Sequence, residues 1–423
     1  MQRQVREILP PEPGSGTPAS GTSASGALAS GGPGSHAPGP VVDAAAATTA
    51  VDAVVDALAA DATAAAVAEA APRRRARPTR TGDHPATIES VAALAGVSTA
   101  TVSRVLTGTT AVRPETRTRV EAAVATLAYV PSGPARALAG SPTWMLGLLM
   151  TDITQPFYTE LARAVEAEAL ARGYSLILAN GAGDVAREAA YLEQLAGRRV
   201  DGILVASRDI TDRHLDWLRS APVEVVLVTC EAPGAPLAAI VSASHSGEAA
   251  AAEHVLALGH RVLGVISGPA ASASSQERRE GAVSAALAAG LPASAVVAVP
   301  SSGDVAGGRS AAAALLARTP RPTAILCYND LVAVGALHAL ADAGLSVPGD
   351  VSVVGFDDVP VAAMVSPALT TVAQAVDDMA RWAVERLAAQ IEARRAGDEA
   401  PAPEVVRHAC RLVVRASTGP SPA

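Results

Sequence analysis

The stretch TIESVAALAGVSTATVSRVLTGTTAVRPETRTRVEAAVATLAYVP, residues 87–131, decides how the first folded part of this chain is interpreted. Its first apolar residues repeat at i, i+3, i+4 and i+7, the period of one helical face: Ile88, Val91, Ala92 and Ala95. Gly96 then favours a turn, and Ser98 is a good N-cap for a second helix that buries Val102, Val105 and Leu106. Two helices joined by a short glycine-containing turn are typical of a helix-turn-helix.

A third helix is expected to begin at Pro114, because proline suits the first turn of a helix. Spacing alone would also fit any small three-helix bundle. The second helix, however, exposes a short polar face made of Thr99, Ala100, Thr101, Ser103 and Arg104. Such a face can enter the major groove of DNA, where Arg104 can pair with a guanine edge through two hydrogen bonds.

The residues before this stretch have a different composition. Residues 1–43 consist mostly of Gly, Pro, Ser, Ala and Thr, which bury too little to offset the entropy of ordering. An arginine-rich segment, PRRRARPTR, follows at residues 72–80. This segment is either a solvated linker or a basic arm that contacts phosphates. A third alternative is that translation of the protein starts near residue 83, so that the preceding residues are not part of it. We predict a disordered low-complexity tail over residues 1–82.

Beyond residue 143, short β-branched runs alternate with helical stretches. The expected strands are 146–150, 175–179, 203–206, 223–228, 240–242, 262–267, 324–327 and 351–355, and the expected helices include 159–171, 247–258 and 331–343. This alternation predicts doubly wound parallel sheets covered by helices on both faces. Because about 275 residues are too many for one open sheet, we expect two similar lobes with a cleft between them.

Composition limits the class of protein. The chain has 423 residues and a formal net charge of −8, and it contains no lysine, so all 33 basic residues are arginines. The three scattered cysteines form no CxxC pair, which indicates a reducing cytosol and excludes a disulfide-stapled domain. Neither a secretory signal nor an apolar run of about 20 residues is present. We expect a cytoplasmic protein without membrane contact.

Two segments, VAALAGVSTATVSRVLTG and VRPETRTRVEAAVATLAYVP, closely resemble the DNA-binding domain of the LacI/GalR (lactose/galactose repressor) family. Downstream segments such as GLLMTDITQPFYTEL, RRVDGILV, PTAILCYNDLVAVGAL and VPGDVSVVGFDD agree with the family in the same order, so the resemblance covers roughly residues 87–395. It implies a helix-turn-helix domain over 83–130, a hinge helix over 131–142, a two-lobed domain similar to periplasmic binding proteins over 143–418, and a short tail over 419–423.

The resemblance also implies roles in DNA binding. Thr99, Ala100 and Arg104 would read bases, whereas Thr101 and Ser103 would contact phosphates. The other expected DNA contacts are Thr87, Ser98, Tyr129 and, in the hinge helix, Ala135 and Leu138. Leu138 would wedge into the minor groove. The chain departs from the family at Gly133, which disfavours a helix, and at Arg113, which replaces a capping serine.

A small-molecule effector is expected in the cleft, because ligands of open α/β sheets bind at the carboxyl ends of strands. The few aromatic residues there support this, although Phe356 could equally fill the core. By family position, Tyr158 stacks on the effector, Arg278, Asn329 and Asp357 hydrogen-bond it, and Gln374 lies in the crossover between lobes. Asp152 and Gln155 shape the first loop. The predicted effector-binding set is Asp152, Phe157, Tyr158, Arg278, Asn329, Asp357 and Gln374.

Several departures bear on the effector. Thr229, Ala243, Ser244 and Val305 stand where relatives often carry carboxylates, an amide or an aromatic ring, and Gln276 replaces an arginine. These changes remove groups that pair with sugar hydroxyls or stack on a ring. The family resemblance implies a sugar or a related metabolite as the effector, but these departures argue against a typical sugar site, so the identity of the effector is left open.

We predict a DNA-binding transcriptional regulator that binds a palindromic operator as a homodimer. Repression is the leading prediction, and activation is left open because the sign depends on the position of the operator. One alternative is a small-molecule binding module without DNA regulation. The other is an NAD-dependent enzyme, suggested by GAGDVA at residues 181–186 with Asp201 as a ribose-binding acid. A ribose-binding acid should close a strand, whereas Asp201 opens one, so we expect no enzymatic activity and no cofactor. The eight histidines show no paired ligand spacing, so we also expect no metal.

Overall fold

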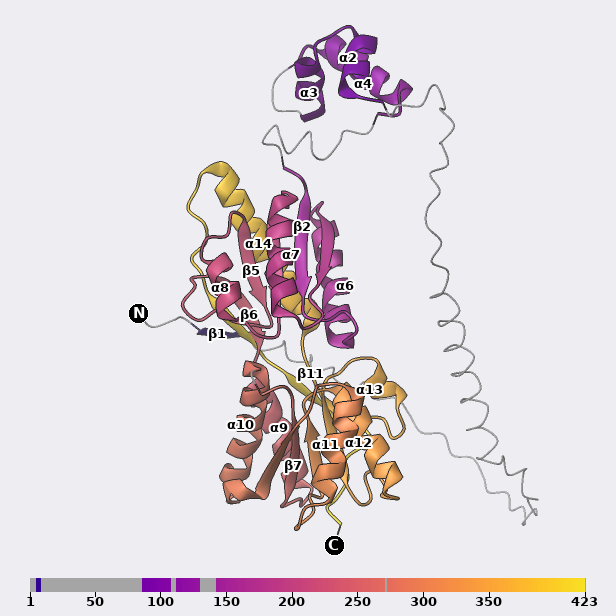
Figure 1. The fold of residues 1–423 in the computed structure, drawn as a ribbon, viewed down its shortest axis with the longest axis vertical. Helices are drawn as coiled ribbons and strands as arrows, with labels where there is room; N and C mark the ends of the chain where they lie inside the picture. Colours follow the sequence, from indigo (N-terminus) through magenta and orange to yellow (C-terminus); the bar gives the residue numbers. More distant parts are fainter. Residues whose placement is uncertain (1–4, 9–85, 108–111, 130–141, 271, 423) are drawn as a thin grey trace, which may run out of the picture. The chain divides into compact units, whose positions relative to one another are not determined.

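The computed structural model describes residues 5–8, 86–107, 112–129, 142–270 and 272–422 (Figure 1). The chain divides into two compact units. The small unit lies within residues 13–130, and the large unit comprises residues 1–12 together with 131–423. The expected hinge helix, with Ala135 and Leu138, lies outside the described residues, as does most of the expected tail.

Among the described residues, the small unit contains the helices α2 (Ile88–Ala95), α3 (Thr99–Thr107) and α4 (Pro114–Thr126). Thr87 caps α2 in a capping box with Ser90, and Gly96 ends this helix at a φ of 64°. The hydroxyl of Ser98 accepts a hydrogen bond from the Thr101 amide at 3.2 Å at the start of α3. The sequence prediction of a helix-turn-helix is therefore confirmed.

The first lobe of the large unit is a parallel sheet. Its strands are β1 (Val5–Ile8), β2 (Met145–Met150), β3 (Ser175–Asn180), β4 (Gly202–Ala206), β5 (Glu224–Val228), β6 (Ala238–Ser242) and β12 (Val405–His408), in the order β1-β12-β6-β5-β4-β2-β3. Helices α6 (Pro156–Ala171) and α14 (Val376–Ala396) pack on one face. Helices α7 (Val185–Gly197) and α8 (Asp212–Leu218) pack on the other.

The second lobe repeats this plan. Its strands are β7 (Leu263–Ser267), β8 (Val296–Pro300), β9 (Ala324–Cys327), β10 (Ser352–Asp357), β11 (Thr370–Ala373) and β13 (Arg411–Val413), in the order β13-β11-β10-β9-β7-β8. Its helices are α9 (Ser244–Ala257), α10 (Ala273–Ala288), the short 3-10 turn η1 (Ala293–Ala295), α11 (Val305–Leu316), α12 (Asp330–Asp342) and α13 (Val361–Met364). The strand β13 runs antiparallel to β11. The two lobes, each a largely parallel sheet covered by helices on both faces, confirm the predicted fold class.

The strands that the sequence did not predict are β1, β8, β11, β12 and β13. The strand β11 shows why apolar runs do not identify every buried strand, since its polar residues Thr370 and Thr371 are fully buried. The hydroxyl of Thr371 donates to Asp330 Oδ1 at 2.6 Å, which offsets the cost of burial. The strands β12 and β13 each contain an arginine, and β8 is a half-exposed edge strand.

Two segments expected to be tails belong to the large unit. The strand β1 pairs in parallel with β12, with Val5 opposite Val405, so the expectation of disorder does not hold for residues 5–8. Its backbone groups satisfy the otherwise open edge of β12. At the other end, the Gly419 amide donates to Ser352 Oγ at 3.1 Å, and the Ser421 amide donates to the carbonyl of Leu258 at 2.9 Å.

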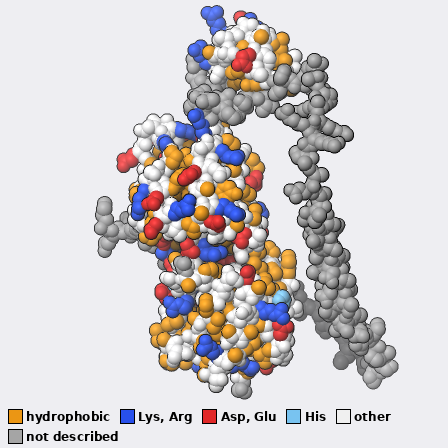
Figure 2. Space-filling model, in the orientation of Figure 1, with side chains coloured by type: hydrophobic (Ala, Val, Ile, Leu, Met, Phe, Trp, Pro, Cys, Tyr) orange, Lys and Arg blue, Asp and Glu red, His pale blue; other side chains and the backbone are white. Residues whose placement is uncertain are grey.

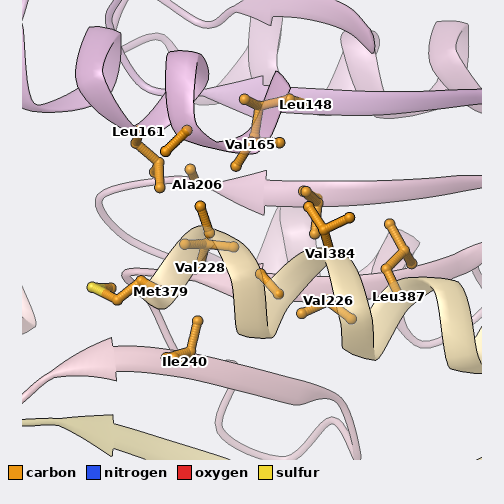
Figure 3. Close-up of a cluster of buried hydrophobic side chains, with 14 of the residues drawn as sticks. Leu148, Leu161, Val165, Ala206, Val226, Val228, Ile240, Met379, Val384 and Leu387 are labelled. Atoms are coloured by element: carbon orange, nitrogen blue, oxygen red, sulfur yellow. The ribbon is translucent and has the colours of Figure 1, made fainter. Parts of the chain in front are cut away.

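The core of the first lobe surrounds α14, whose apolar face lies against the sheet (Figure 3). Met379, Val384 and Leu387 of α14 point toward Val226, Val228 and Ile240 of the strands, all of them fully buried. The chain passes between the lobes after β6, after β11 and after β12. The strand β11 therefore belongs to the second lobe, while the helix that follows it completes the core of the first.

Helices α11 and α12 of the second lobe pack backbone to backbone through glycines. A Cβ placed on Gly335 would lie 2.1 Å from the carbonyl oxygen of Val305, and one placed on Gly308 would lie 2.3 Å from the carbonyl oxygen of Val332. Only glycine permits this approach.

We expect Gly335→Ala to lower the free energy of unfolding by about 1–3 kcal/mol, because the added methyl forces the two helices apart. Urea denaturation followed by circular dichroism measures this change. Gly197→Ala is the matched control, since nothing lies within 4 Å of the Cβ that it adds, and it should leave stability unchanged or slightly higher. Equal stabilities for the two variants would contradict the assignment of a glycine-dependent contact.

Candidate functional site

Loops from both lobes enclose a cavity of about 420 Å³. It lies at the carboxyl ends of strands, the usual position of ligands in open α/β sheets. Figure 2 shows acidic and basic side chains close together where the two lobes meet. The members of the predicted effector-binding set that line the cavity are Phe157, Tyr158, Arg278, Asn329, Asp357 and Gln374.

Arg278, on α10, forms the floor of the cavity and is 7% exposed. Its guanidinium carbon lies 3.5 Å from the ring centroid of Phe356 and 4.9 Å from that of Tyr328, and it donates to the carbonyl of Tyr328. Phe356 itself is fully buried beneath the guanidinium and does not line the cavity. The ring is therefore a platform for Arg278.

Two buried carboxyl groups depend on the charge of Arg278. Asp357 Oδ1 lies 3.9 Å from Arg278 Nη2. Burial raises the pKa of Asp357 to about 6, against the opposing effects of Arg278 and Gln374. Burial raises the pKa of Glu248, on α9, to about 8, again opposed by Arg278. Removing the guanidinium would leave the carboxylate of Asp357 without its cation, so Arg278 supports the fold as well as the cavity.

Gln374 lies in the crossover between β11 and α14, as the family resemblance implied. Its amide Nε2 donates to Asp357 Oδ1 at 2.6 Å, and its Oε1 accepts a hydrogen bond from the hydroxyl of Ser242. Ser242 ends β6 in the first lobe, whereas Asp357 ends β10 in the second. The Gln374 amide therefore connects polar groups of both lobes.

Asn329 lines the cavity, but half of its hydrogen-bonding capacity is used within the protein. Its Oδ1 accepts from the Val332 amide at 2.8 Å, which caps α12, and its Nδ2 donates to the carbonyl of Gly303 at 3.0 Å. One amide hydrogen and one lone pair are left for a ligand. Asn329 thus positions the cavity loops in addition to facing the cavity.

Phe157 and Tyr158 form the aromatic wall on the first lobe. Their ring centroids are 5.4 Å apart at an interplanar angle of 76°. Burial raises the pKa of Tyr158, so its hydroxyl stays protonated. Asp152, by contrast, is not among the residues that line the cavity. Its Oδ1 accepts hydrogen bonds from the amide and the hydroxyl of Thr154, so it shapes the loop before α6.

Sequence reasoning missed a charged group that joins the lobes. Arg407, on β12, pairs with Glu231 of the first lobe and, at 3.1 Å, with Glu277 of α10 in the second. All three residues line the cavity. Arg407 could not be assigned to the cavity from the sequence, because β12 was not predicted as a strand.

The sequence analysis missed Arg208 and Asp209, which follow β4, and it left Thr229, which follows β5, out of the effector-binding set. Arg208 and Asp209 line the cavity, and burial raises the pKa of Asp209 while Arg208 and the amide of Ala273 lower it. Thr229 also lines the cavity, and among the described residues its buried Oγ1 has no hydrogen-bond partner. Their positions at strand ends are the signal that could have identified them.

The small unit presents the predicted polar face on α3. Thr99, Ala100 and Arg104 are exposed and Thr101 and Ser103 are half-buried, while Val102 and Val105 face the core. Tyr129 differs from the prediction, since it is 9% exposed and packs in the core of the three helices. An aromatic ring after α4 gains more from covering a small core than from exposure. Arg113 precedes α4 without a side-chain cap, as its sequence suggested.

The GAGDVA loop does not have the geometry of a dinucleotide site. Asp184 occupies the N-terminus of α7, where its carboxylate accepts hydrogen bonds from the amides of Ala186 and Arg187. A carboxylate there repels a pyrophosphate. Asp201 accepts hydrogen bonds from the amides of Thr143 and Trp144 and pairs with Arg395. Asp201, the acid that suggested the enzyme, and Asp184 of the glycine-rich loop are thus both engaged in the fold.

A helix-turn-helix unit joined to a two-lobed domain with a polar cavity defines a class of bacterial transcriptional regulators. Residues 87–132 match the family described as bacterial regulatory proteins of the lacI family, and residues 252–418 match the periplasmic binding protein-like domain. Among the described residues, no helix is long and apolar enough to cross a membrane.

Similar proteins of known name agree with this class. The HTH-type transcriptional repressor PurR of Photobacterium profundum is 36% identical over 309 residues, which cover 73% of this chain and 92% of the relative. PurR of Yersinia pestis bv. Antiqua (strain Antiqua) is 35% identical over 340 residues, covering 80% and 98%. The lac repressor dimer bound to operator and the anti-inducer ONPF matches with a TM-score of 0.68 at 27% identity, covering 79% of this chain and 100% of that chain.

The chain belongs to the LacI family. The predicted fold class and the predicted function of an effector-controlled, DNA-binding transcriptional repressor are confirmed at this level.

Glu248 gives the large unit a testable pH dependence. Its folded pKa of about 8 exceeds its ordinary value of 4.5, so unfolding releases a proton between these pH values and this group's contribution to stability falls as the pH rises. Glu248→Gln should make the decline of unfolding free energy shallower by about 1.4 kcal/mol per pH unit in this window. Urea denaturation at a series of pH values measures the slope, with exposed Glu253→Gln on the same helix as control. A Glu248→Gln profile parallel to that of the wild type would refute the account.

Proposed function

We propose that this chain represses transcription by binding an operator through α3, and that a small molecule in the cavity controls this binding. The observation that carries the proposal is the presence in one chain of an exposed polar helix in a helix-turn-helix and an enclosed polar cavity between two lobes. Repression follows the names of the relatives. We further propose a homodimer on a palindromic operator, a cytoplasmic location and no enzymatic activity.

In the DNA complex that we propose, Thr99, Ala100 and Arg104 read base edges. Ala100 has no polar group and would contact a thymine methyl, whereas Arg104 would pair with a guanine. Thr101 and Ser103 position the helix on phosphates, with Thr87 and Ser98 at the helix starts. Ala135 and Leu138 of the hinge segment would enter the minor groove.

For the effector, we propose a sugar or a related metabolite. Solved relatives include a CelR–cellobiose complex, at a TM-score of 0.59 and 31% identity over 78% of this chain and 99% of that chain. Tyr158 would stack on the ligand, and Arg278, Asn329 and Asp357 would hydrogen-bond it. The unpartnered Oγ1 of Thr229 would gain a partner from a ligand hydroxyl.

A competing function is a small-molecule binding module that does not regulate DNA. The specific feature against it is the polar exposure of Thr99 and Arg104, which a structural bundle does not need.

Arg104→Ala tests the proposed base contact. The wild-type full chain first selects a duplex from a random DNA library, and gel shift then measures its affinity for wild type and variant. We expect a loss of about 10- to 100-fold, because one bidentate base contact is worth about 1–3 kcal/mol. Arg119→Ala, an exposed arginine on α4, is the control and should change specific affinity much less. Unchanged affinity in Arg104→Ala would remove the base-reading role, and failure to select any duplex would favour the binding module.

A further inference from the structure

The chain enters the large unit at residues whose backbone is held by one carboxylate. Asp201 Oδ1 accepts a hydrogen bond from the Thr143 amide at 3.1 Å, and Oδ2 accepts one from the Trp144 amide at 2.8 Å. The Asp201 amide donates in turn to the carbonyl of Met145 at 2.8 Å. Trp144 is held at a φ of 55°, a conformation that side-chain-bearing residues rarely adopt. Asp201 therefore fixes the backbone at the start of β2.

The last turn of α14 completes this arrangement. Arg395 Nη2 lies 2.8 Å from Asp201 Oδ2, and the guanidinium carbon lies 5.3 Å from the ring centroid of Trp144. Arg395 also contacts the hydroxyl of Tyr174, whose ring lies 5.3 Å from that of Trp144. We call Trp144, Tyr174, Asp201 and Arg395 the anchor cluster. Trp144 is 46% exposed although three neighbours hold it.

The same helix begins at the cavity. Val376, its first residue, follows Gln374 by two positions, and Gln374 bonds Asp357 and Ser242. At a rise of about 1.5 Å per residue, the 21 residues of α14 span about 30 Å. Figure 1 shows α14 running from the junction of the lobes to the end of the first lobe where β2 begins.

Close packing makes α14 a stiff connection. Met379, Val384 and Leu387 are fully buried along its length. A Cβ placed on Gly202, next to Asp201, would lie 2.8 Å from Leu387 Cδ1, so the helix is in tight contact with the start of β4. A shift of α14 at its cavity end would therefore have to move the anchor cluster or break this packing.

We propose that Asp201 and Arg395 are positioning residues for operator binding, and that α14 couples the Gln374 crossover at the cavity to the backbone at Thr143 and Trp144. The proposal rests on the proposed function, because residues 131–142 join the DNA-binding unit to this backbone. An ordinary structural ion pair would stabilise the lobe without linking these two ends.

A double-mutant cycle on operator affinity separates the two cases. Gln374→Ala, Arg395→Gln and the double variant are compared in gel shift on the duplex selected by wild type, with no effector added. Sites about 30 Å apart normally contribute additively. We expect each single change to alter the dissociation constant by up to about tenfold, and the double variant to match the larger single effect instead of their product.

Arg394→Gln is the matched control, because Arg394 is the neighbouring residue of α14 and pairs with Glu224 at 3.3 Å, away from Thr143 and Trp144. Its cycle with Gln374→Ala should be additive. Additive effects for Arg395→Gln as well would overturn the proposal, while the proposed function would stand as long as wild type selects a duplex. If Arg395→Gln does not fold, Trp144→Leu replaces it in the cycle with the same expectations.

Discussion

The burial of one guanidinium, that of Arg278, is the constraint on which the cavity depends. A buried cation is costly unless other groups compensate it. Two aromatic rings, the carbonyl of Tyr328 and the carboxylate of Asp357 do so here. Because these partners lie on β10 and directly after β9, α10 cannot separate from the sheet of the second lobe without exposing an unpaired charge. The floor of the cavity is thus set before any ligand binds.

The two lobes are joined by polar groups. Hydrogen bonds and ion pairs are directional, so they favour one arrangement of the lobes more than apolar contacts would. The amide of Gln374 connects Ser242 and Asp357, and Arg407 connects Glu231 and Glu277. A ligand that competes for these groups changes the balance between arrangements of the lobes, and it can shift that balance only by its differential affinity. This is why we propose the cavity as a site for regulation and not only for binding.

The sequence predicted features that local physics determines. The spacing of Val91 and Val102 predicted the helix-turn-helix, and β-branched runs predicted most of the strands, although the apolar edge strand β8 was missed. Other features could not be predicted because they depend on contacts with residues that are far away in the sequence. Thr371 is buried in β11 because Asp330, far away in sequence, accepts its hydrogen bond. Arg407 reaches the cavity through strand pairing, and Tyr129 was assigned to DNA although it fills the core. The family resemblance located most of the cavity, but not the groups that are particular to this chain.

We propose that occupancy of the cavity and DNA binding are coupled. Because such coupling is reciprocal, DNA must affect the cavity just as a ligand affects DNA binding. Hydrogen–deuterium exchange of the full chain, with and without the selected operator duplex, tests this without knowledge of the effector. The account predicts altered exchange in the small unit and also in peptides that contain Arg278 and Gln374. Changes confined to residues 86–141, with the cavity peptides unaffected, would contradict it.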